Sequence, residues 1–260
     1  MELLTVDKTI CKKDRMCIDA CPLGCIEADA EGFPVESAGG GCIECGHCVA
    51  ICPHGAISNA RLPMEAFTQV PEAVADPEAV EALMKTRRSV RMFKDRPVPR
   101  EKMAKLLDIA RFAPTASNSQ QLQWVVIMDP ARTRVVAEMS AEWFRAANLR
   151  PRLVELWDQG RDVYLRGAPH LVLACAPSDY RWGAVDCSIA LTYMELAAAS
   201  MGLGVYWGGL PTVAIASHPP LAQALPLPQG HTVHGALMVG VPKYRYRSVP
   251  PRKEVRAVWL

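Results

Sequence analysis

Eight of the ten cysteines lie between Cys11 and Cys52, and their spacing indicates a chemistry. The run that ends in Pro53 has the pattern C-x2-C-x2-C-x3-C-P, formed by Cys42, Cys45, Cys48 and Cys52. This spacing lets three thiolates of one tight loop reach three irons of a cubane, while the fourth serves a second cluster. Zinc sites seldom pack four cysteines so closely before a proline. The pattern therefore predicts an iron–sulfur site.

The pattern has an earlier partner in the chain. A shift of 31 positions superimposes Cys42, Cys48, Cys52, Pro53, Gly55 and Ile57 on Cys11, Cys17, Cys21, Pro22, Gly24 and Ile26. This internal repeat over residues 5–60 resembles a two-cluster bacterial ferredoxin. The resemblance implies two ligand sets, one of Cys42, Cys45, Cys48 and Cys21, the other of Cys11, Cys17 and Cys52.

The earlier copy lacks one thiolate, because Cys45 falls on Asp14. Three interpretations are open. Asp14 binds the fourth iron through a carboxylate oxygen, which is a harder ligand than sulfur; or the site holds a three-iron cluster; or water or an exogenous ligand takes that corner. Cys25 falls on Ala56, where a small buried residue is expected, so we interpret it as a core residue.

Composition and charge divide the chain in two. Residues 1–62 carry a net charge of −4, whereas residues 63–260 carry +6. Prolines recur in the segment between them, so we expect a ferredoxin-type domain at 1–62, a linker at 63–78 and a second domain at 79–260. Without a long apolar run, a leader-like start or a basic run with interleaved aromatics, we expect a cytoplasmic protein that binds neither membrane nor nucleic acid.

Four short stretches of the second domain carry groups suited to a cofactor. Residues 87–91, Arg-Arg-Ser-Val-Arg, offer forked guanidinium donors and a hydroxyl, which suit a phosphate. Residues 113–120 form a polar loop with hydroxyls and amides. The paired glycines in residues 207–211 let a backbone approach a flat ligand. Residues 250–252 are again cationic, and none of the four stretches is specific alone.

Together and in this order, the four stretches resemble the nitroreductase family of FMN flavoproteins. The resemblance rests on RRSVRMF at 87–93, APTASNSQQ at 113–121, GAVDCSIALTYMELAAASMGLGVYWGGLP at 183–211, VGVP at 239–242 and Arg252. The whole chain resembles the ferredoxin-fused branch of that family. What this implies is an α+β sandwich that forms a homodimer, with FMN at the subunit interface.

The resemblance also implies roles for particular residues. The FMN phosphate and ribityl chain would be contacted by Arg87, Arg88, Ser89 and Arg91, and Arg252 would complete the phosphate site. The isoalloxazine and ribityl would be lined by Ser117, Asn118 and Gln120. Gly208 and Gly209 would direct backbone N–H groups at the flavin N5 and O4. Many relatives have a lysine where this chain has Pro250, which shifts the phosphate clamp toward the N-terminal arginines.

These features predict an FMN-dependent oxidoreductase that passes electrons between its clusters and its flavin. The expected acceptor is a nitroaromatic, a quinone or a similar electron-poor small molecule, and the donor is NAD(P)H or a redox protein. The alternative is an electron carrier whose partner is another redox protein. No Ser–His–Asp triad or pair of carboxylates is evident, so we expect no side chain to be an indispensable covalent or acid catalyst.

Hydrophobic periodicity predicts the elements of the second domain. We expect helices at 78–86, 99–113, 131–149, 151–166 and 184–201. We expect strands at 123–128, 171–175, 204–207 and 233–239. The helix at 184–201 is apolar nearly all round, which indicates burial against another element or subunit. Cys175 and Cys187 fall in these apolar stretches and are expected in the core.

Overall fold

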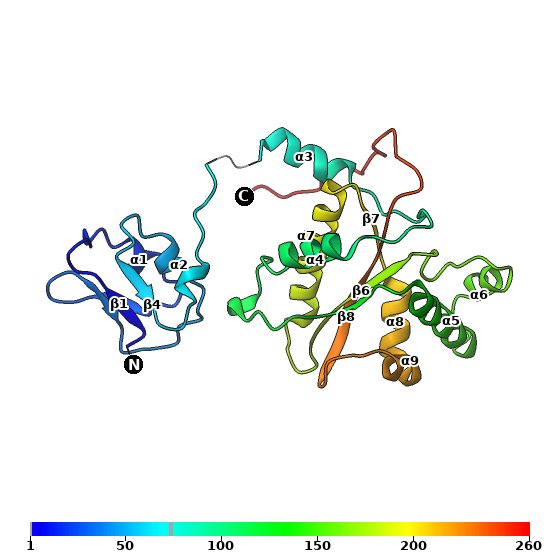
Figure 1. Cartoon of the computed structure of the whole chain (residues 1–260), viewed down its shortest axis with the longest axis horizontal. Helices are drawn as coiled ribbons and strands as arrows, with labels where there is room; N and C mark the ends of the chain where they lie inside the picture. The colour runs from blue at the N-terminus through cyan, green and yellow to red at the C-terminus, as the bar shows by residue number, and fades with distance from the viewer. Residues whose placement is uncertain (1, 73–74) are drawn as a thin grey trace. The chain divides into compact units, whose positions relative to one another are not determined.

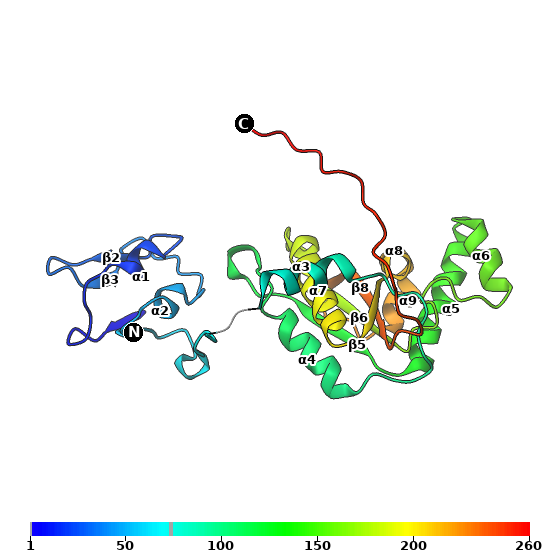
Figure 2. The same cartoon turned by 90° about the horizontal axis from the view of Figure 1, so that it is seen from above.

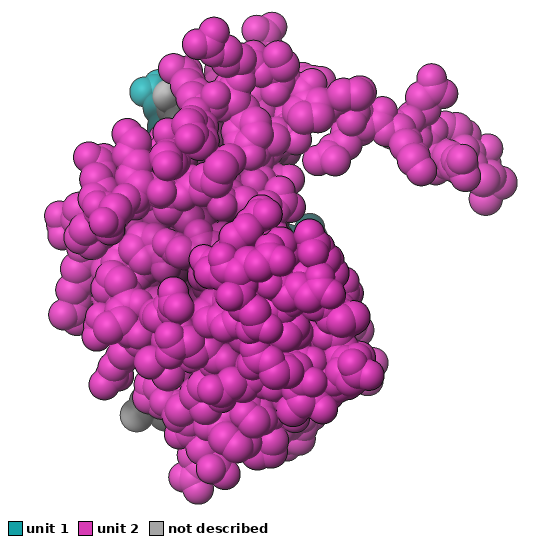
Figure 3. Space-filling view, turned by 90° about the vertical axis from the view of Figure 1, so that its right-hand side faces the viewer, with its two compact units in different colours: residues 1–74, 117–119 teal, residues 75–116, 120–260 magenta. Residues whose placement is uncertain are grey.

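The computed structural model describes residues 2–72 and 75–260, which form two compact units. The first unit comprises residues 1–74 and 117–119, and the second comprises residues 75–116 and 120–260 (Figure 3). The domain limits at 62 and 78 stay predictions; part of the predicted linker, residues 73–74, lies outside the described residues. Among the described residues, no helix is long and apolar enough to cross a membrane.

The first unit repeats one small motif twice. Two antiparallel pairs of strands form, β1 (Leu4–Val6) with β4 (Ile57–Asn59) and β2 (Ile26–Ala28) with β3 (Pro34–Glu36). Two one-turn helices, α1 (Met16–Asp19) and α2 (His47–Ala50), begin 31 positions apart. Their inner faces bury Cys17 and Cys48 beside Ile26 and Ile57. The sequence repeat is thus a structural repeat.

The repeat extends to the backbone dihedral angles around each helix start. Lys13 and Glu44 both have a φ of 55°, and Arg15 and Gly46 have 66° and 74°. Left-handed residues are needed to fold the chain back around a cysteine loop, and glycine adopts this conformation without steric cost. Arg15 adopts it at a cost of about 1–2 kcal/mol. The loop that contains Asp14 therefore has the same chain path as the loop that contains Cys45.

A four-stranded antiparallel sheet forms the centre of the second unit (Figure 1). Its strand order is β5 (Gln123–Ile127), β6 (His170–Pro177), β8 (His231–Gly240) and β7 (Gly204–Trp207). Alternate side chains of β6 enter two separate hydrophobic clusters, with Leu171 and Leu173 in one and Val172 and Ala174 in the other. Because both faces of β6 are buried, it reads in the sequence as a continuous apolar run.

Helices cover both faces of this sheet (Figures 1 and 2). Helices α5 (Pro130–Ala146), α8 (Gly209–Ser217) and α9 (Pro219–Ala224) contribute to the first cluster. Helices α4 (Arg100–Ala110) and α7 (Gly183–Ser200) contribute to the second. Helix α3 (Pro77–Thr86) contacts α7, and α6 (Pro151–Asp158) contacts α5. One-turn 3-10 segments occur at Met64–Ala66 and Ala116–Asn118.

Most of the predicted elements are confirmed to within three residues at each end, but one helix is shorter than predicted and two helices were missed. The helix predicted at 151–166 ends at Asp158, because Asp162 then caps a loop by accepting from the amides of Tyr164, Leu165 and Gly167. Helices α8 and α9 were not predicted, although the proline pair after His218 marks a helix start.

Cys175 and Cys187 lie fully buried, and burial raises their thiol pKa values to about 11 and about 12.

His170 connects β6 to the segment before α4. Its Nδ1 donates to the Met128 carbonyl oxygen at 2.9 Å, so Nε2 is the acceptor for the Val98 N–H at 2.7 Å. This pair of contacts requires the neutral ring. Burial lowers the pKa of His170 below its ordinary 6.5. The unfolded chain therefore binds a proton that the folded chain excludes.

From this we predict a loss of stability with acid that depends on His170. Its contribution is present above pH 6.5 and is lost as the pH falls below that value, by at most about 1.4 kcal/mol per pH unit. The variant His170→Gln should show a smaller slope of unfolding free energy against pH. Urea unfolding followed by tryptophan fluorescence measures this in the second unit, which contains all six tryptophans. The half-buried His231→Gln serves as control; equal slopes in all three proteins would contradict the prediction.

Candidate functional site

The first unit contains two cavities lined by cysteines. One is lined by Cys11, Cys17 and Cys52 together with Asp14, and the other by Cys21, Cys42, Cys45 and Cys48. Their volumes are the same, about 20 Å³ each. The fold thus brings together each of the two ligand sets predicted from the sequence. The cavity with the aspartate is no smaller than the cavity with four thiolates.

The donor groups fit iron–sulfur clusters better than single metal ions. In residues 2–72 and 75–260, no three His, Cys, Asp or Glu side chains are grouped to hold one metal ion. The cysteines instead surround a cavity, as cubane ligands must. Backbone N–H groups point at their sulfurs, from Cys25 to Cys21 at 3.2 Å and from Ala56 to Cys52 at 3.4 Å. Such hydrogen bonds favour the thiolate form and set cluster potentials.

Cys25 lies in the wrong place to replace the missing thiolate. It lines the cavity that already has four cysteines, where it is 3% exposed and donates to the Gly40 carbonyl oxygen at 3.2 Å. Its repeat partner Ala56 is 4% exposed and lines the other cavity. The two residues fill equivalent small core positions, as the repeat predicts.

Asp14 lines its cavity with both carboxylate oxygens engaged. Oδ1 accepts from the Met16 N–H at 3.1 Å, and Oδ2 lies 3.6 Å from Nε2 of His54. The turn at Met16 therefore fixes the direction of the side chain. A metal ion that binds Oδ2 would have to replace the His54 contact.

In the second unit, a buried carboxylate joins two of the predicted cofactor segments. Glu195 lies on α7 and is 6% exposed. One of its oxygens accepts from Nη1 of Arg87 at 2.7 Å, and the other from Nε1 of Trp207 at 3.3 Å. Arg87 is thus held by a carboxylate, and one of its donors is not free to bind a phosphate. Sequence reasoning missed Glu195, although a lone acid in an apolar helix is a signal that could have identified it.

A second buried carboxylate of α7 holds a third segment. Asp186 is 2% exposed, and both of its oxygens lie 3.2 Å from the Ala116 N–H. Oδ2 also accepts from the Tyr180 hydroxyl at 2.6 Å. The loop predicted to line a flavin therefore begins at an amide that α7 fixes.

Several of the cations in the second unit surround one open cavity, which we call the cationic cavity. Its lining includes Arg87, Arg88, Lys94, Lys243 and Arg245 beside two tyrosines. No acidic side chain lines it. Nε of Arg88 is buried with no hydrogen-bond partner among the described residues. A buried guanidinium N–H without a partner costs free energy, so the arrangement fits an anion that supplies the acceptor. Sequence reasoning missed Lys94, Lys243 and Arg245, because they are isolated until the fold collects them.

Ser89 and Arg91 lie along β7. A bridge joins Ser89 to Val205, and the Val90 N–H donates to the Val205 carbonyl oxygen at 2.8 Å. The Arg91 guanidinium lies over the Tyr206 ring, 4.6 Å from its centroid. Neither residue lines the cationic cavity.

Three residues of the polar loop have an unusual backbone conformation. Ser117, Asn118 and Gln120 have φ values of 51°, 53° and 49°, which few residues other than glycine adopt. The Gln120 N–H donates to Oγ1 of Thr115 at 3.1 Å. Ser117 and Asn118 are grouped with the first unit and Gln120 with the second, and their contacts to a flavin stay a prediction.

The two glycines differ in what they can offer. The Gly208 N–H already donates to the Ala236 carbonyl oxygen at 2.9 Å, so it is not the free donor that was predicted. Gly209 is the first residue of α8, where amides have no partner within the helix. A Cβ there would meet no atom within 4 Å, which leaves space for a ligand.

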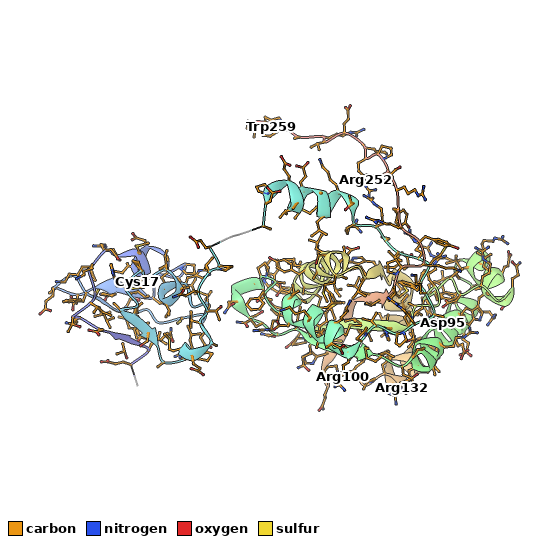
Figure 4. All side chains as sticks on the ribbon, turned by 45° about the horizontal axis from the view of Figure 1, so that its top comes forward. Cys17, Asp95, Arg100, Arg132, Arg252 and Trp259 are labelled. Atoms are coloured by element: carbon orange, nitrogen blue, oxygen red, sulfur yellow. The ribbon has the colours of Figure 1, made fainter. Side chains whose placement is uncertain are left out.

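Arg252 was predicted to complete a phosphate site, but it does not line the cationic cavity. It lies on the exposed C-terminal segment that also contains Trp259 (Figure 4). Lys243 and Arg245 provide the C-terminal cations of the cavity instead.

The buried contacts of Glu195 predict a measurable loss of stability. The variant Glu195→Gln removes the charge that pairs with Arg87 and should lower the free energy of unfolding by about 1–3 kcal/mol. Urea unfolding measures the loss. The control is Glu138→Gln, whose oxygen accepts from Arg134 on an exposed helix face and should cost less than about 1 kcal/mol. Equal losses of unfolding free energy in the two variants would show that the buried pair stabilises the fold no more than the exposed pair does.

Comparison with known proteins identifies both units. The profile of the nitroreductase family matches residues 84–241, and that of a 4Fe-4S dicluster domain matches residues 3–53. A putative NADH dehydrogenase/NAD(P)H nitroreductase of Methanothermobacter thermautotrophicus is 32% identical over 141 residues, 53% of this chain and 63% of that protein. This chain thus spans less than two thirds of that relative's length.

Two further likenesses concern one unit each. A nitroreductase with bound FMN from Desulfitobacterium hafniense superimposes with a TM-score of 0.60 at 20% identity, over 69% of this chain and 98% of that one. A protein named ferredoxin 7Fe, from Hydrogenibacillus schlegelii, is 33% identical over 57 residues, 22% of this chain and 70% of that protein. The family match covers more than half of the chain, and the fold agrees with it. The chain belongs to the nitroreductase family and has a 4Fe-4S dicluster domain ahead of the family's α+β domain.

Proposed function

We propose that this protein is an FMN-dependent oxidoreductase whose own iron–sulfur clusters exchange single electrons with the flavin, and which reduces an electron-poor small molecule such as a nitroaromatic or a quinone. The observation that carries the proposal is the presence, in one chain, of two cysteine-lined cavities and a cavity lined by cations on a nitroreductase fold. Clusters transfer electrons singly, and FMN exchanges them singly or in pairs, so the flavin links carriers of the two kinds.

Residues of the second unit fit an FMN molecule at two points. The cations of the open cavity, with the unpartnered Nε of Arg88, suit the phosphate. The amides of Gly209 and Leu210, at the start of α8, suit negative charge on the reduced ring system. The open space at Gly209 lets a planar group approach the backbone. Glu195 fixes one residue next to each of these two points. It accepts hydrogen bonds from Arg87, which would lie beside the phosphate, and from Trp207, which precedes the glycines.

We further propose a homodimer. The C-terminal segment exposes apolar residues that a single chain leaves in water, with Val255 at 89% and Trp259 at 92% exposure. On α7, Val185 and Tyr193 are also exposed. Burial of such side chains against a second copy would gain about 25 cal/mol for each Å² removed from water. NAD(P)H as a donor is part of the proposal because relatives are named for it, among them an FMN reductase [NAD(P)H] of Bacillus subtilis.

The experiment that tests this function uses the full chain purified without oxygen. We expect bound FMN and iron together, a flavin that is reduced once the clusters are reduced, and turnover with a nitroaromatic or quinone. Optical and EPR spectra follow each group separately. Failure with every small acceptor, with fast turnover by a protein partner, would instead support the electron-carrier alternative.

A pair of variants tests the phosphate contacts in the same experiment. The double variant Arg88→Gln/Lys243→Gln should bind FMN on the order of 100-fold or more weakly, since each contact to a charged group contributes about 1.5–3 kcal/mol. Lys102→Gln, on the exposed side of α4, is the matched control and should bind FMN like the native chain. Unchanged affinity in the double variant would place the phosphate elsewhere.

We propose that Asp14 sets the nature of the first cluster, either as an oxygen ligand of its fourth iron or by leaving that corner empty in a three-iron cluster. The equal loop dihedrals support a position equivalent to that of Cys45, and the likeness to a ferredoxin 7Fe supports unequal clusters. Asp14→Cys should therefore change the EPR signature and bring the iron content to that of two complete cubanes. Asp19→Cys, on the exposed side of α1, is the control. An unchanged signature in Asp14→Cys would show that this position does not determine the cluster.

A further inference from the structure

The positive charges of the first unit are concentrated at one place. Four of the five Lys and Arg in residues 1–62 lie between Lys8 and Arg15. Residues 1–62 as a whole are nevertheless acidic. Three of them, Lys12, Lys13 and Arg15, line the cavity that contains Asp14. The cavity with four cysteines has no Lys or Arg in its lining. The two cavities thus differ in charge, since only the cavity with Asp14 is lined by Lys and Arg.

These three charges have no ion-pair partner among the described residues. Lys8 forms ion pairs with Asp29 and Glu31, whereas Lys12, Lys13 and Arg15 form none with any described residue. Nζ of Lys13 donates to the Glu31 carbonyl oxygen and lies 4.1 Å from the centroid of the Phe33 ring, which leaves its charge uncompensated. All three side chains are exposed.

The internal repeat provides a comparison within the same chain. At the positions equivalent to Lys12, Lys13 and Arg15, the second copy has Ile43, Glu44 and Gly46. Both loops have the same chain path, so the path itself does not require the cations. Arg15 even occupies a left-handed position, φ 66°, where the other copy has glycine. The fold needs a left-handed residue there but not an arginine, so the strain that Arg15 accepts indicates a function for its side chain.

Apolar side chains lie next to these charges. Ile10 and Met16, at either end of the segment, are 40% and 39% exposed. We call the surface formed by Ile10, Lys12, Lys13, Arg15 and Met16 the cationic face. Exposed apolar groups among uncompensated charges of one sign are suited to brief protein contacts, because the charges steer the encounter and the apolar groups hold it.

We propose that the cationic face docks an acidic one-electron carrier protein, which reduces the cluster in the cavity beneath it. The inference rests on the proposed function, since it assumes a cluster there. In the docked complex one electron leaves the reduced carrier and enters the oxidised cluster, and no bond or proton changes place. Charge complementarity selects the occupant: residues 63–260 carry a net charge of +6, so the acidic surface comes from another protein. The same cations favour the more negative, reduced cluster and so make it an electron acceptor.

The test compares the native holoprotein with a variant in which the cationic face takes the residues of the repeat, Lys12→Ile/Lys13→Glu/Arg15→Gly. The probe is a small, strongly acidic flavodoxin. Binding of the oxidised probe is measured by calorimetry at several salt concentrations, and cluster reduction by the reduced probe is measured by stopped flow. We expect the affinity and the rate constant of the native protein to fall with salt, and the variant to lose on the order of 10- to 100-fold in rate. Reduction by dithionite, a small donor that needs no docking surface, should slow far less than reduction by the probe.

Two controls separate docking from damage. Lys102→Gln/Lys105→Gln/Arg132→Gln removes three exposed charges from the second unit and should leave probe reduction unchanged. The single charge reversal Lys12→Glu keeps the strained loop intact and should still slow the probe if the triple variant fails to load iron. Native rates in Lys12→Glu and in the loaded triple variant, or native rates independent of salt, would overturn this inference alone. Absence of iron from the native protein would overturn the proposed function as well.

Discussion

The second unit depends on two carboxylates buried along one apolar helix. Helix α7 packs against β6 and β8 with a side chain set that is otherwise almost entirely apolar, and such burial of a charge is costly unless the charge is paired. Asp186 and Glu195 meet that requirement by accepting hydrogen bonds from segments far away in the sequence. As a result, the loops around Ala116, Arg87 and Trp207 are all hydrogen-bonded to the same helix, α7. A cofactor that touches these loops would find them held at fixed distances before it binds.

The first unit obtains its order in a different way. It has a small apolar core, and four short strands contribute little by themselves. Cysteines 17 and 48 are part of this core as well as of the cavities. Cluster binding and folding are therefore the same event for much of this unit, because the ligands and the core share residues. The repeat arranges this twice with one chain path.

Much of this organisation could be read from the sequence, and the failures have identifiable causes. Cysteine spacing and the 31-residue shift, with the resemblance to a two-cluster ferredoxin, predicted which cysteines line each of the two cavities. Strands β5 to β8 were recognisable as apolar runs. By contrast, the partner of Arg87 lies 108 positions away, and Lys243 meets Arg88 only through the fold. The amide of Gly208 was predicted to be free, but strand pairing had already used it. Long-range pairing of this kind has no local signal.

The matching left-handed residues of the two cysteine loops have a consequence for how such a domain can change. The chain takes the same path in both loops, because Lys13 matches Glu44 and Arg15 matches Gly46 in φ. The side chains in these loops can therefore differ without a change of the backbone. A duplicated frame allows one copy to keep the full set of sulfur ligands while the other accumulates new residues. Asp14 and its charged neighbours are such residues. The two copies can therefore specialise independently, one for retention of a complete cluster and the other for exchange with the surroundings.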